Sequence, residues 1–181
     1  MIFNLALGLG ASLLWIALLI YSKRQPDRRI WPPLRYFWLT AIWAWGLTIA
    51  IYVGQIGAGT TEWNAWGWPG WLRHGLGGGL SLLGSAYQSW AVLVLGLKGT
   101  SGWPVPLVTN GPYAQMRHPQ YLGQMATFLG IAIWCASPAA FVIGLAGAAA
   151  LVLAARVENR FLAETQTDHH SWAARVPGVL S

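Results

Sequence analysis

Apolar residues fill most of the chain in five long runs, which short polar stretches separate. A helix needs roughly 20 residues to cross the hydrocarbon core of a bilayer, and the runs reach or approach that length. Backbone in lipid must satisfy its hydrogen bonds within a helix or a closed barrel, and no alternating pattern indicates a barrel. The pattern predicts an all-α integral membrane bundle of five transmembrane helices, at about residues 2–21, 36–54, 75–97, 120–136 and 139–156.

The last two runs are joined only by Ser137-Pro138, so we expect a tight helical hairpin with its tip at the far membrane surface. The first run has no basic segment before it and no small-residue cleavage site, which predicts a retained helix and not a signal peptide. With 55% hydrophobic and 9% charged residues among 181, we expect one membrane domain, residues 1–181, without a soluble second domain. Its residues 1–97 form three N-terminal helices and its residues 98–181 hold the hairpin and a polar tail.

Basic residues predict the orientation, because cytoplasmic loops are enriched in Lys and Arg. Five crossings leave Arg73 alone on one side. The other side carries ten basic residues, which are Lys23, Arg24, Arg28, Arg29, Arg35, Lys98, Arg117, Arg156, Arg160 and Arg175. The N-terminus is therefore expected outside, with the loops 22–35 and 98–119 and the C-terminal tail in the cytosol.

Charge and cysteine content exclude several other functions. The formal net charge of +6 comes from short clusters beside the apolar runs, so we expect no nucleic-acid partner. Cys135 is the only cysteine, which excludes an intrachain disulfide and a cysteine metal cluster. His169 and His170 are adjacent on the polar tail without further ligands at a supporting spacing, so we expect them to be solvated and expect no metal site.

Two further patterns concern the membrane itself. The outer loop 55–74 is rich in tryptophan, which is typical of an interfacial aromatic belt, although a mouth for an apolar ligand is an alternative. Small residues recur at steps of four in two helices, which predicts close packing within one bundle, with dimerisation as the alternative. They are Gly75 and Gly79, then Gly77, Ser81 and Ser85, and later Ala140, Gly144 and Ala148.

The chemically informative segment lies between the third and fourth apolar runs. Asn110-Gly111-Pro112 predicts a turn, and Pro119 suits the first position of the fourth helix, since it lacks the N–H that would stay unpaired there. The N-terminus of a helix attracts anions such as the carboxylate of an amino-acid-like cofactor. Arg117 and His118 would add donors there, or they are only an anchor and a cap.

Glu158 lies just beyond the fifth apolar run. His118 and Glu158 are each 20 positions from Pro138, so a helical hairpin should bring both to the same depth. At about 1.5 Å of rise per residue they emerge roughly 30 Å from the tip, at the cytoplasmic boundary. Tyr113 should fold back over them, because the chain turns just before it. Alternatively, Glu158 is a surface carboxylate paired with Arg160.

The region 103–177 resembles the isoprenylcysteine carboxyl methyltransferase family and the related phospholipid N-methyltransferases. The shared elements are G-P-Y at 111–113, R-H-P-x-Y-x-G at 117–123, a helical hairpin, E-x-x-x-L from Glu158, and R-x-P from Arg175. The resemblance implies that S-adenosyl-L-methionine lies between the segment 105–121 and the extension of helix five. It implies cofactor contacts from Leu107, Val108, Gly111, Tyr113, Arg117, His118, Pro119, Gln120, Tyr121 and Glu158.

The sequence also departs from that family. Members often carry two adjacent glutamates where this chain has Glu158-Asn159, and Ala154 replaces an arginine on the substrate side. We expect Arg156 or Arg160 to take over from that arginine, and we assign catalytic roles to Arg156 and Glu158. The hypothesis is methyl transfer to a lipid-soluble acceptor, most like isoprenylcysteine carboxyl O-methylation. A phospholipid amine or small-thiol methyltransferase, and a non-catalytic protein that keeps the fold, are the alternatives.

Overall fold

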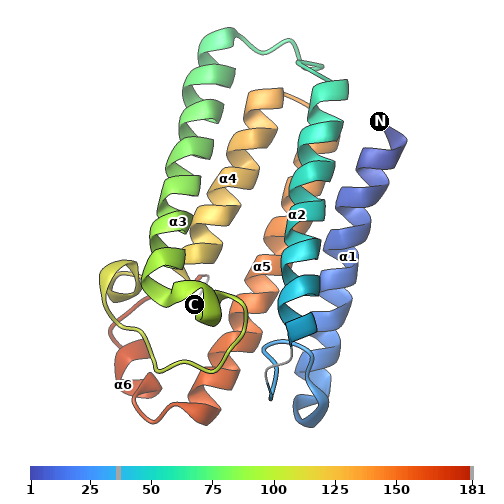
Figure 1. The fold of residues 1–181 in the computed structure, drawn as a ribbon. Helices are drawn as coiled ribbons and strands as arrows, with labels where there is room; N and C mark the ends of the chain where they lie inside the picture. The colour runs from blue at the N-terminus through green and yellow to red at the C-terminus, as the bar shows by residue number, and fades with distance from the viewer. Residues whose placement is uncertain (36–37, 180–181) are drawn as a thin grey trace.

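Long helices run side by side in a single bundle (Figure 1). The computed structural model describes residues 1–35 and 38–179, and this part of the chain contains helices and no strands. Its long helices are α1 (Ile2–Arg24), α2 (Trp38–Thr61), α3 (Gly79–Thr100), α4 (Pro119–Cys135) and α5 (Pro138–Thr165). Its short elements are η1 (Pro26–Arg28), the π-helical η2 (Trp71–Gly78) that runs into α3, η3 (Gly111–Ala114) and α6 (His169–Ala173).

The bundle has the lengths and the surface of a membrane protein. Within the described residues, four helical stretches are long and apolar enough to cross a bilayer: Ile2–Arg24, Trp38–Thr61, Trp71–Thr100 and Pro138–Thr165. The 17-residue α4 is shorter and packs inside the same bundle, so its status as a fifth span stays a prediction. Large apolar side chains cover the outer surface, as expected where lipid replaces water.

Several helices continue past the ends that the apolar runs predicted. The predicted start at residue 36 lies outside the described residues, and α2 continues to Thr61 instead of ending at residue 54. The Trp-rich outer loop is therefore shorter than predicted. α5 continues nine residues beyond residue 156, to Thr165, because a helix that leaves the bilayer no longer needs an apolar sequence. This extension carries Glu158.

Small residues bring α3 and α4 into close contact. A Cβ added at Gly84 would lie 2.7 Å from the carbonyl oxygen of Gly123, and one at Gly123 would lie 2.6 Å from the backbone nitrogen of Gln88. The hydroxyl groups of Ser85 and Thr127 form a hydrogen bond of 3.2 Å between the same helices. Of the small residues that the sequence singled out before α4, Gly77, Ser81 and Ser85 pack against α4 as predicted. Gly75 and Gly79 do not, because a Cβ added at either would meet nothing within 4 Å.

The α4–α5 hairpin turns where the sequence predicted. Ala136 adopts the left-handed conformation with φ 48°, and Ser137 caps α5 by accepting a hydrogen bond from the backbone N–H of Ala140. Glu62, just after α2, accepts hydrogen bonds from the Ser137 hydroxyl at 2.9 Å and the Ala139 N–H at 3.1 Å. Its negative charge also favours the positive end of the α5 dipole.

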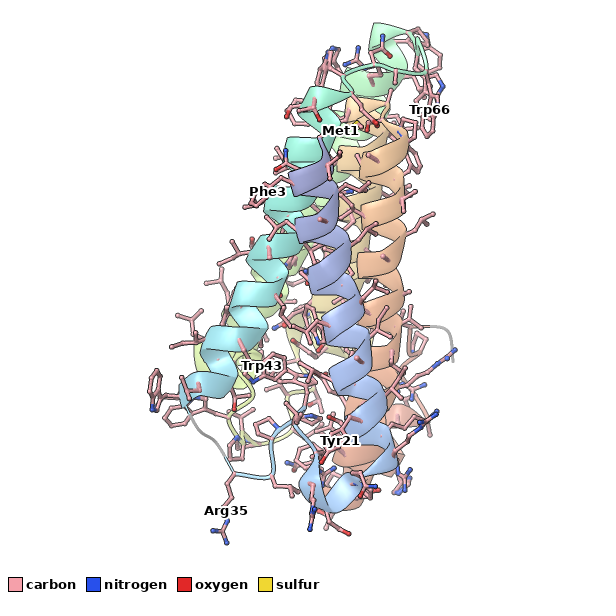
Figure 2. All side chains as sticks on the ribbon, turned by 90° about the vertical axis from the view of Figure 1, so that its right-hand side faces the viewer. Met1, Phe3, Tyr21, Arg35, Trp43 and Trp66 are labelled. Carbon is pink, nitrogen blue, oxygen red and sulfur yellow. The ribbon has the colours of Figure 1, made fainter. Side chains whose placement is uncertain are left out.

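The two ends of the bundle differ in chemistry. Figure 2 shows Met1 and Trp66 toward one end, and Tyr21 and Arg35 toward the other. At the first end, the guanidinium of Arg73 lies 4.3 Å from the centre of a Trp63 ring. The loop after α3, η3, α6 and the C-terminal segment gather at the second end (Figure 1). That end holds the residues that the sequence singled out.

Candidate active site

A cavity of about 510 Å³ lies at the end of the bundle that holds α6, and Trp172 of α6 is one of its lining residues. Its walls come from the loop after α1, from the segment 103–108, and from helices α1 to α5. On α5 the lining residues recur every three or four positions, which places them on one face of the helix. They are Glu158, Phe161, Leu162 and Thr165, and Gln166 lines the cavity just after the helix ends. The extension of α5 beyond its apolar run thus forms one wall.

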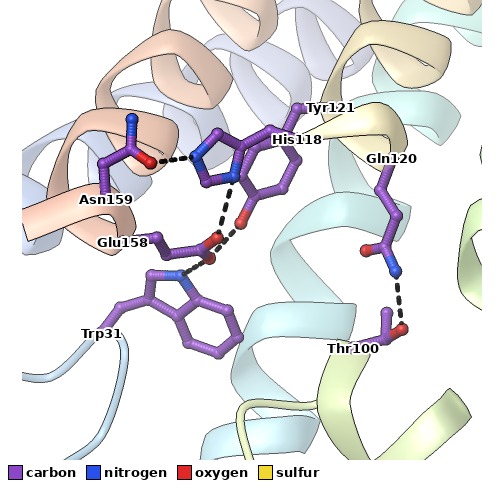
Figure 3. Close-up of polar contacts among 7 residues, drawn as sticks. All are labelled: Trp31, Thr100, His118, Gln120, Tyr121, Glu158 and Asn159. Atoms are coloured by element: carbon purple, nitrogen blue, oxygen red, sulfur yellow. Dashed lines mark hydrogen bonds and ion pairs between the residues drawn. The ribbon is translucent and has the colours of Figure 1, made fainter. Parts of the chain in front are cut away.

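Glu158 is the centre of a hydrogen-bond network in this cavity (Figure 3). One carboxylate oxygen accepts hydrogen bonds from the indole N–H of Trp31, at 2.7 Å, and from the hydroxyl of Tyr121. The other oxygen lies 3.5 Å from Nδ1 of His118. The side chain of Glu158 is 20% exposed, and that of His118 only 4%. The predicted meeting of His118 and Glu158 is therefore confirmed, and Glu158 is not a surface carboxylate paired with Arg160.

His118 links α4 to α5. It occupies the position before Pro119, the first residue of α4, as the sequence predicted. Its Nε2 lies 3.1 Å from Oδ1 of Asn159, and its ring stacks on Tyr121 with centroids 5.6 Å apart. The Asn159 amide carries both a donor and an acceptor, so it can pair with the imidazole in either tautomer. A second glutamate at 159 would only accept.

The segment before α4 and the first turn of α4 supply further lining residues. Leu107, Val108, Tyr113, Arg117 and Gln120 all line the cavity. Burial, together with the nearby charge of Glu158, raises the pKa of the Tyr113 phenol, which therefore stays a protonated donor. Nε of Arg117 is buried without a hydrogen-bond partner. The cavity that Glu158 lines thus also carries a tyrosine ring and an arginine whose Nε has no partner.

Three predicted residues do not line the cavity. Gly111 has a positive φ of 56°, which glycine adopts readily, and packs beside Val94. Pro119 is buried at the start of α4. Arg156 is exposed and lines a small separate cleft beside Ser22. A catalytic role for Arg156 stays a prediction that no contact with the cavity supports.

Comparison with known proteins adds the decisive observation. The family model described as phospholipid methyltransferase matches residues 72–167, which is just over half of the chain and includes both His118 and Glu158. This chain belongs to the phospholipid methyltransferase family. The cobalt-zinc-cadmium resistance protein CzcN of Cupriavidus metallidurans is 30% identical over 142 residues, which cover 77% of this chain and 62% of CzcN. The chain thus spans less than two thirds of that relative, and no solved structure matches it.

In this family member the C-terminal segment is hydrogen-bonded to the segment before α4. The indole N–H of Trp172 donates to the carbonyl of Tyr113 at 3.1 Å, and the backbone N–H of Arg117 donates to the carbonyl of Pro177 at 3.0 Å. His169 is 4% exposed and packs against Trp172, so the prediction that it is solvated is wrong; its neighbour His170 is exposed. The bond from Trp172 holds Tyr113 in the wall of the cavity that Glu158 also lines.

The N-terminal half of this methyltransferase-family chain also contributes site residues, which sequence reasoning missed. Trp31 donates to Glu158, and Arg29 lines the cavity wall beside it. Deeper in the bundle, Trp15 and Gln88 line the cavity from α1 and α3. Sequence reasoning also missed Gln124, which lines the cavity from α4 in the C-terminal half. One signal could have found Gln88 and Gln124, because polar side chains inside apolar helices are costly and usually functional.

Proposed function

We propose that this protein transfers a methyl group from S-adenosyl-L-methionine to an apolar acceptor that enters from the bilayer. The observation that carries the proposal is the cavity in front of Glu158. Its lining includes the Glu158 carboxylate, which Trp31 and Tyr121 hold in place, together with tyrosine rings and the buried Nε of Arg117. The chain that forms it belongs to the phospholipid methyltransferase family. Its volume of about 510 Å³ lies within the range of sites for small molecules and cofactors.

The side chains present fit S-adenosyl-L-methionine. The unpartnered Nε of Arg117 would donate to its carboxylate. Tyr113 and Tyr121 would offer π faces to the sulfonium or the adenine, and Glu158 would accept hydrogen bonds from the ribose hydroxyls or the ammonium group. Leu107, Val108 and Gln120 also line the cavity and would complete the wall around the cofactor. The bound cofactor supplies an electrophilic methyl group on a positively charged sulfur.

The chain itself would contribute positioning and the exclusion of water. Trp31, Tyr121 and His118 hold the Glu158 carboxylate in one orientation before any ligand binds. A site fixed in this way avoids reorganisation during the reaction, and bringing two reactants together removes much of the entropic barrier. Methyl transfer to a carboxylate needs no general base, so positioning and desolvation would supply most of the rate.

The acceptor would lie toward the middle of the membrane. Trp15, Ala44 and Thr48 line the deep part of the cavity, and all three belong to helices that are long enough to cross a bilayer. An apolar chain would pack there while its reactive end approaches the cofactor. We propose a reaction most like isoprenylcysteine carboxyl O-methylation. Ala154 is fully buried and offers no charge to such a carboxylate.

A phospholipid amine is the second candidate acceptor, because the matching family model is that of phospholipid methyltransferases. A protonated amine must lose a proton before it can attack a methyl group. The His118–Glu158 pair lies at the cavity and could take that proton. Product analysis with labelled cofactor and a panel of phospholipids, prenylcysteines and thiols would separate the amine, carboxylate and small-thiol acceptors.

We also propose that the cofactor enters from the cytosol. Ten of the eleven Lys and Arg residues lie on the side that five crossings place with the C-terminus. A reporter fused at the C-terminus should therefore be cytosolic, and one inserted near Trp66 should be external. Finding both reporters on one side would contradict the five-span topology.

Cofactor binding tests the proposal directly. Isothermal titration calorimetry of the detergent-solubilised protein with S-adenosylhomocysteine should give saturable binding at one site. Trp31→Phe and Glu158→Gln should both weaken it, since both change the Glu158 network. A protein without measurable affinity for S-adenosylmethionine or S-adenosylhomocysteine would instead be a non-catalytic member that keeps the fold.

A further inference from the structure

Arg29 is a largely buried cation that lines both the main cavity and the small cleft beside Ser22. It follows η1 in the loop after α1, and its side chain is only 11% exposed. Its guanidinium carbon lies 4.3 Å from the centre of the Phe161 ring, on the cavity face of α5. The function proposed above gives this residue no role.

The hydrogen-bonding capacity of Arg29 is only partly used. Its Nη1 lies 3.6 Å from a carboxylate oxygen of Glu164, which is too long for a good hydrogen bond. That carboxylate is 42% exposed and pairs more closely, at 3.0 Å, with Nε of Arg160. Nε of Arg29 is buried and has no hydrogen-bond partner. A buried charge with unsatisfied donors is costly, and an anion that enters the cavity would reduce that cost.

The charges around the cavity leave Arg29 available for a second ligand. Among the described residues, the Asp, Glu, Lys and Arg side chains that line the cavity are Arg29, Arg117 and Glu158. Our proposed function pairs Arg117 with the cofactor carboxylate and Glu158 with its hydroxyl or ammonium groups. The cofactor brings one negative and two positive charges, so its binding adds positive charge to a cavity that is already positive. An anionic second ligand would restore the balance.

We propose that Arg29 binds an anionic oxygen group of the methyl acceptor, a carboxylate or a phosphate. The inference rests on the proposed methyltransferase function and assigns an acceptor-recognition residue to the first loop. The planar guanidinium matches the geometry of both anions. Phe161 supports its flat face from α5. The acceptor is then an amphiphile with an apolar chain among the helices and an anionic group beside Arg29.

The test uses two amphiphiles with the same chain. The purified protein in dodecyl maltoside, saturated with S-adenosylhomocysteine, is titrated with dodecyl phosphate and with uncharged dodecanol. Wild-type protein should bind dodecyl phosphate more tightly. Arg29→Gln should weaken dodecyl phosphate binding roughly 10-fold to 100-fold, the range expected for lost hydrogen bonds to a charged group, and should leave dodecanol binding unchanged.

Two further variants control for surface charge and for folding. Arg28→Gln removes the same charge from an exposed neighbour that does not line the cavity, so dodecyl phosphate binding should be unchanged. Arg29→Lys keeps the charge without the planar fork, and its affinity should lie between those of wild type and Arg29→Gln. An S-adenosylhomocysteine affinity equal to that of wild type shows that each variant is folded.

Three results would overturn the assignment. Equal losses in Arg28→Gln and Arg29→Gln would mean a diffuse charge effect. An unchanged dodecyl phosphate affinity in Arg29→Gln would mean that Arg29 only supports the loop. If Arg29→Gln weakens S-adenosylmethionine binding but not that of decarboxylated S-adenosylmethionine, Arg29 holds the cofactor carboxylate instead. Failure of the wild-type protein to bind S-adenosylhomocysteine would count against the proposed function itself, and this outcome is distinct from the other three.

Discussion

Replacing Glu158 with glutamine should weaken cofactor binding while leaving the bundle folded. The carboxylate accepts from Trp31 and Tyr121 through one oxygen and faces His118 through the other. An amide keeps one acceptor but loses the charge, and its NH₂ group opposes one of these donors. The site therefore loses both a charge-assisted partner for the cofactor and the fixed orientation of that partner.

The expected loss follows from the burial of Glu158. Its side chain is 20% exposed, so solvent screens it only in part. Hydrogen bonds to charged groups contribute about 1.5–3 kcal/mol. Because Glu158 is partly exposed, we lower the bottom of this range and expect a loss of binding free energy of about 1–3 kcal/mol. The dissociation constant for S-adenosylhomocysteine should rise by roughly 5-fold to 150-fold. Calorimetry in detergent measures this change directly.

Glu164→Gln is the matched control. It makes the same substitution on the same helix, but Glu164 is 42% exposed and does not line the main cavity. Its cofactor affinity should equal that of the wild type. If Glu158→Gln binds S-adenosylhomocysteine with wild-type affinity, the carboxylate does not contact the cofactor and the proposed cofactor site is wrong.

Three further changes test other contacts. Trp31→Phe keeps a ring but removes the N–H that donates to Glu158, so cofactor affinity should fall about 3-fold to 10-fold by calorimetry. Glu62→Gln removes the charge that caps α5, and thermal unfolding should show a loss of about 0.5–2 kcal/mol with unchanged cofactor affinity. Burial lowers the pKa of His169, so the folded protein binds fewer protons than the unfolded chain. Stability should therefore fall as the pH drops below about 6.5, and His169→Phe should reduce that pH dependence.

The hairpin geometry could be predicted because it depends on few variables. Two continuous helices pivot at Pro138, and the rise per residue of a helix is fixed, so equal sequence distances give equal depths. The structure confirms the consequence, with His118 and Glu158 in contact. The motif around His118 also indicated the correct element boundary, because Pro119 begins α4.

The contributions of the first loop could not be predicted in the same way. Trp31 and Glu158 are separated by 127 positions, and their contact depends on the path of a loop without periodicity. Sequence reasoning missed Arg29 for the same reason and used its charge only to predict the orientation in the membrane. Hydropathy also placed the end of the last helix too early, because it reports where the lipid contact ends. His169 lies in a polar segment, and only tertiary packing against Trp172 shows that it is buried.

Transfer of a labelled methyl group is the most direct test of the central claim. Purified protein in vesicles of bacterial lipid extract would be incubated with methyl-labelled S-adenosylmethionine, and the organic and aqueous phases would then be separated and counted. Our account predicts label in a lipid-soluble product with the wild-type protein, and much less with Glu158→Gln at a fixed cofactor concentration below saturation. The same assay would be repeated with prenylcysteine and thiol acceptors. If the wild-type protein is folded and binds S-adenosylmethionine, but the label stays entirely in the cofactor with every acceptor, a methyltransferase function is contradicted.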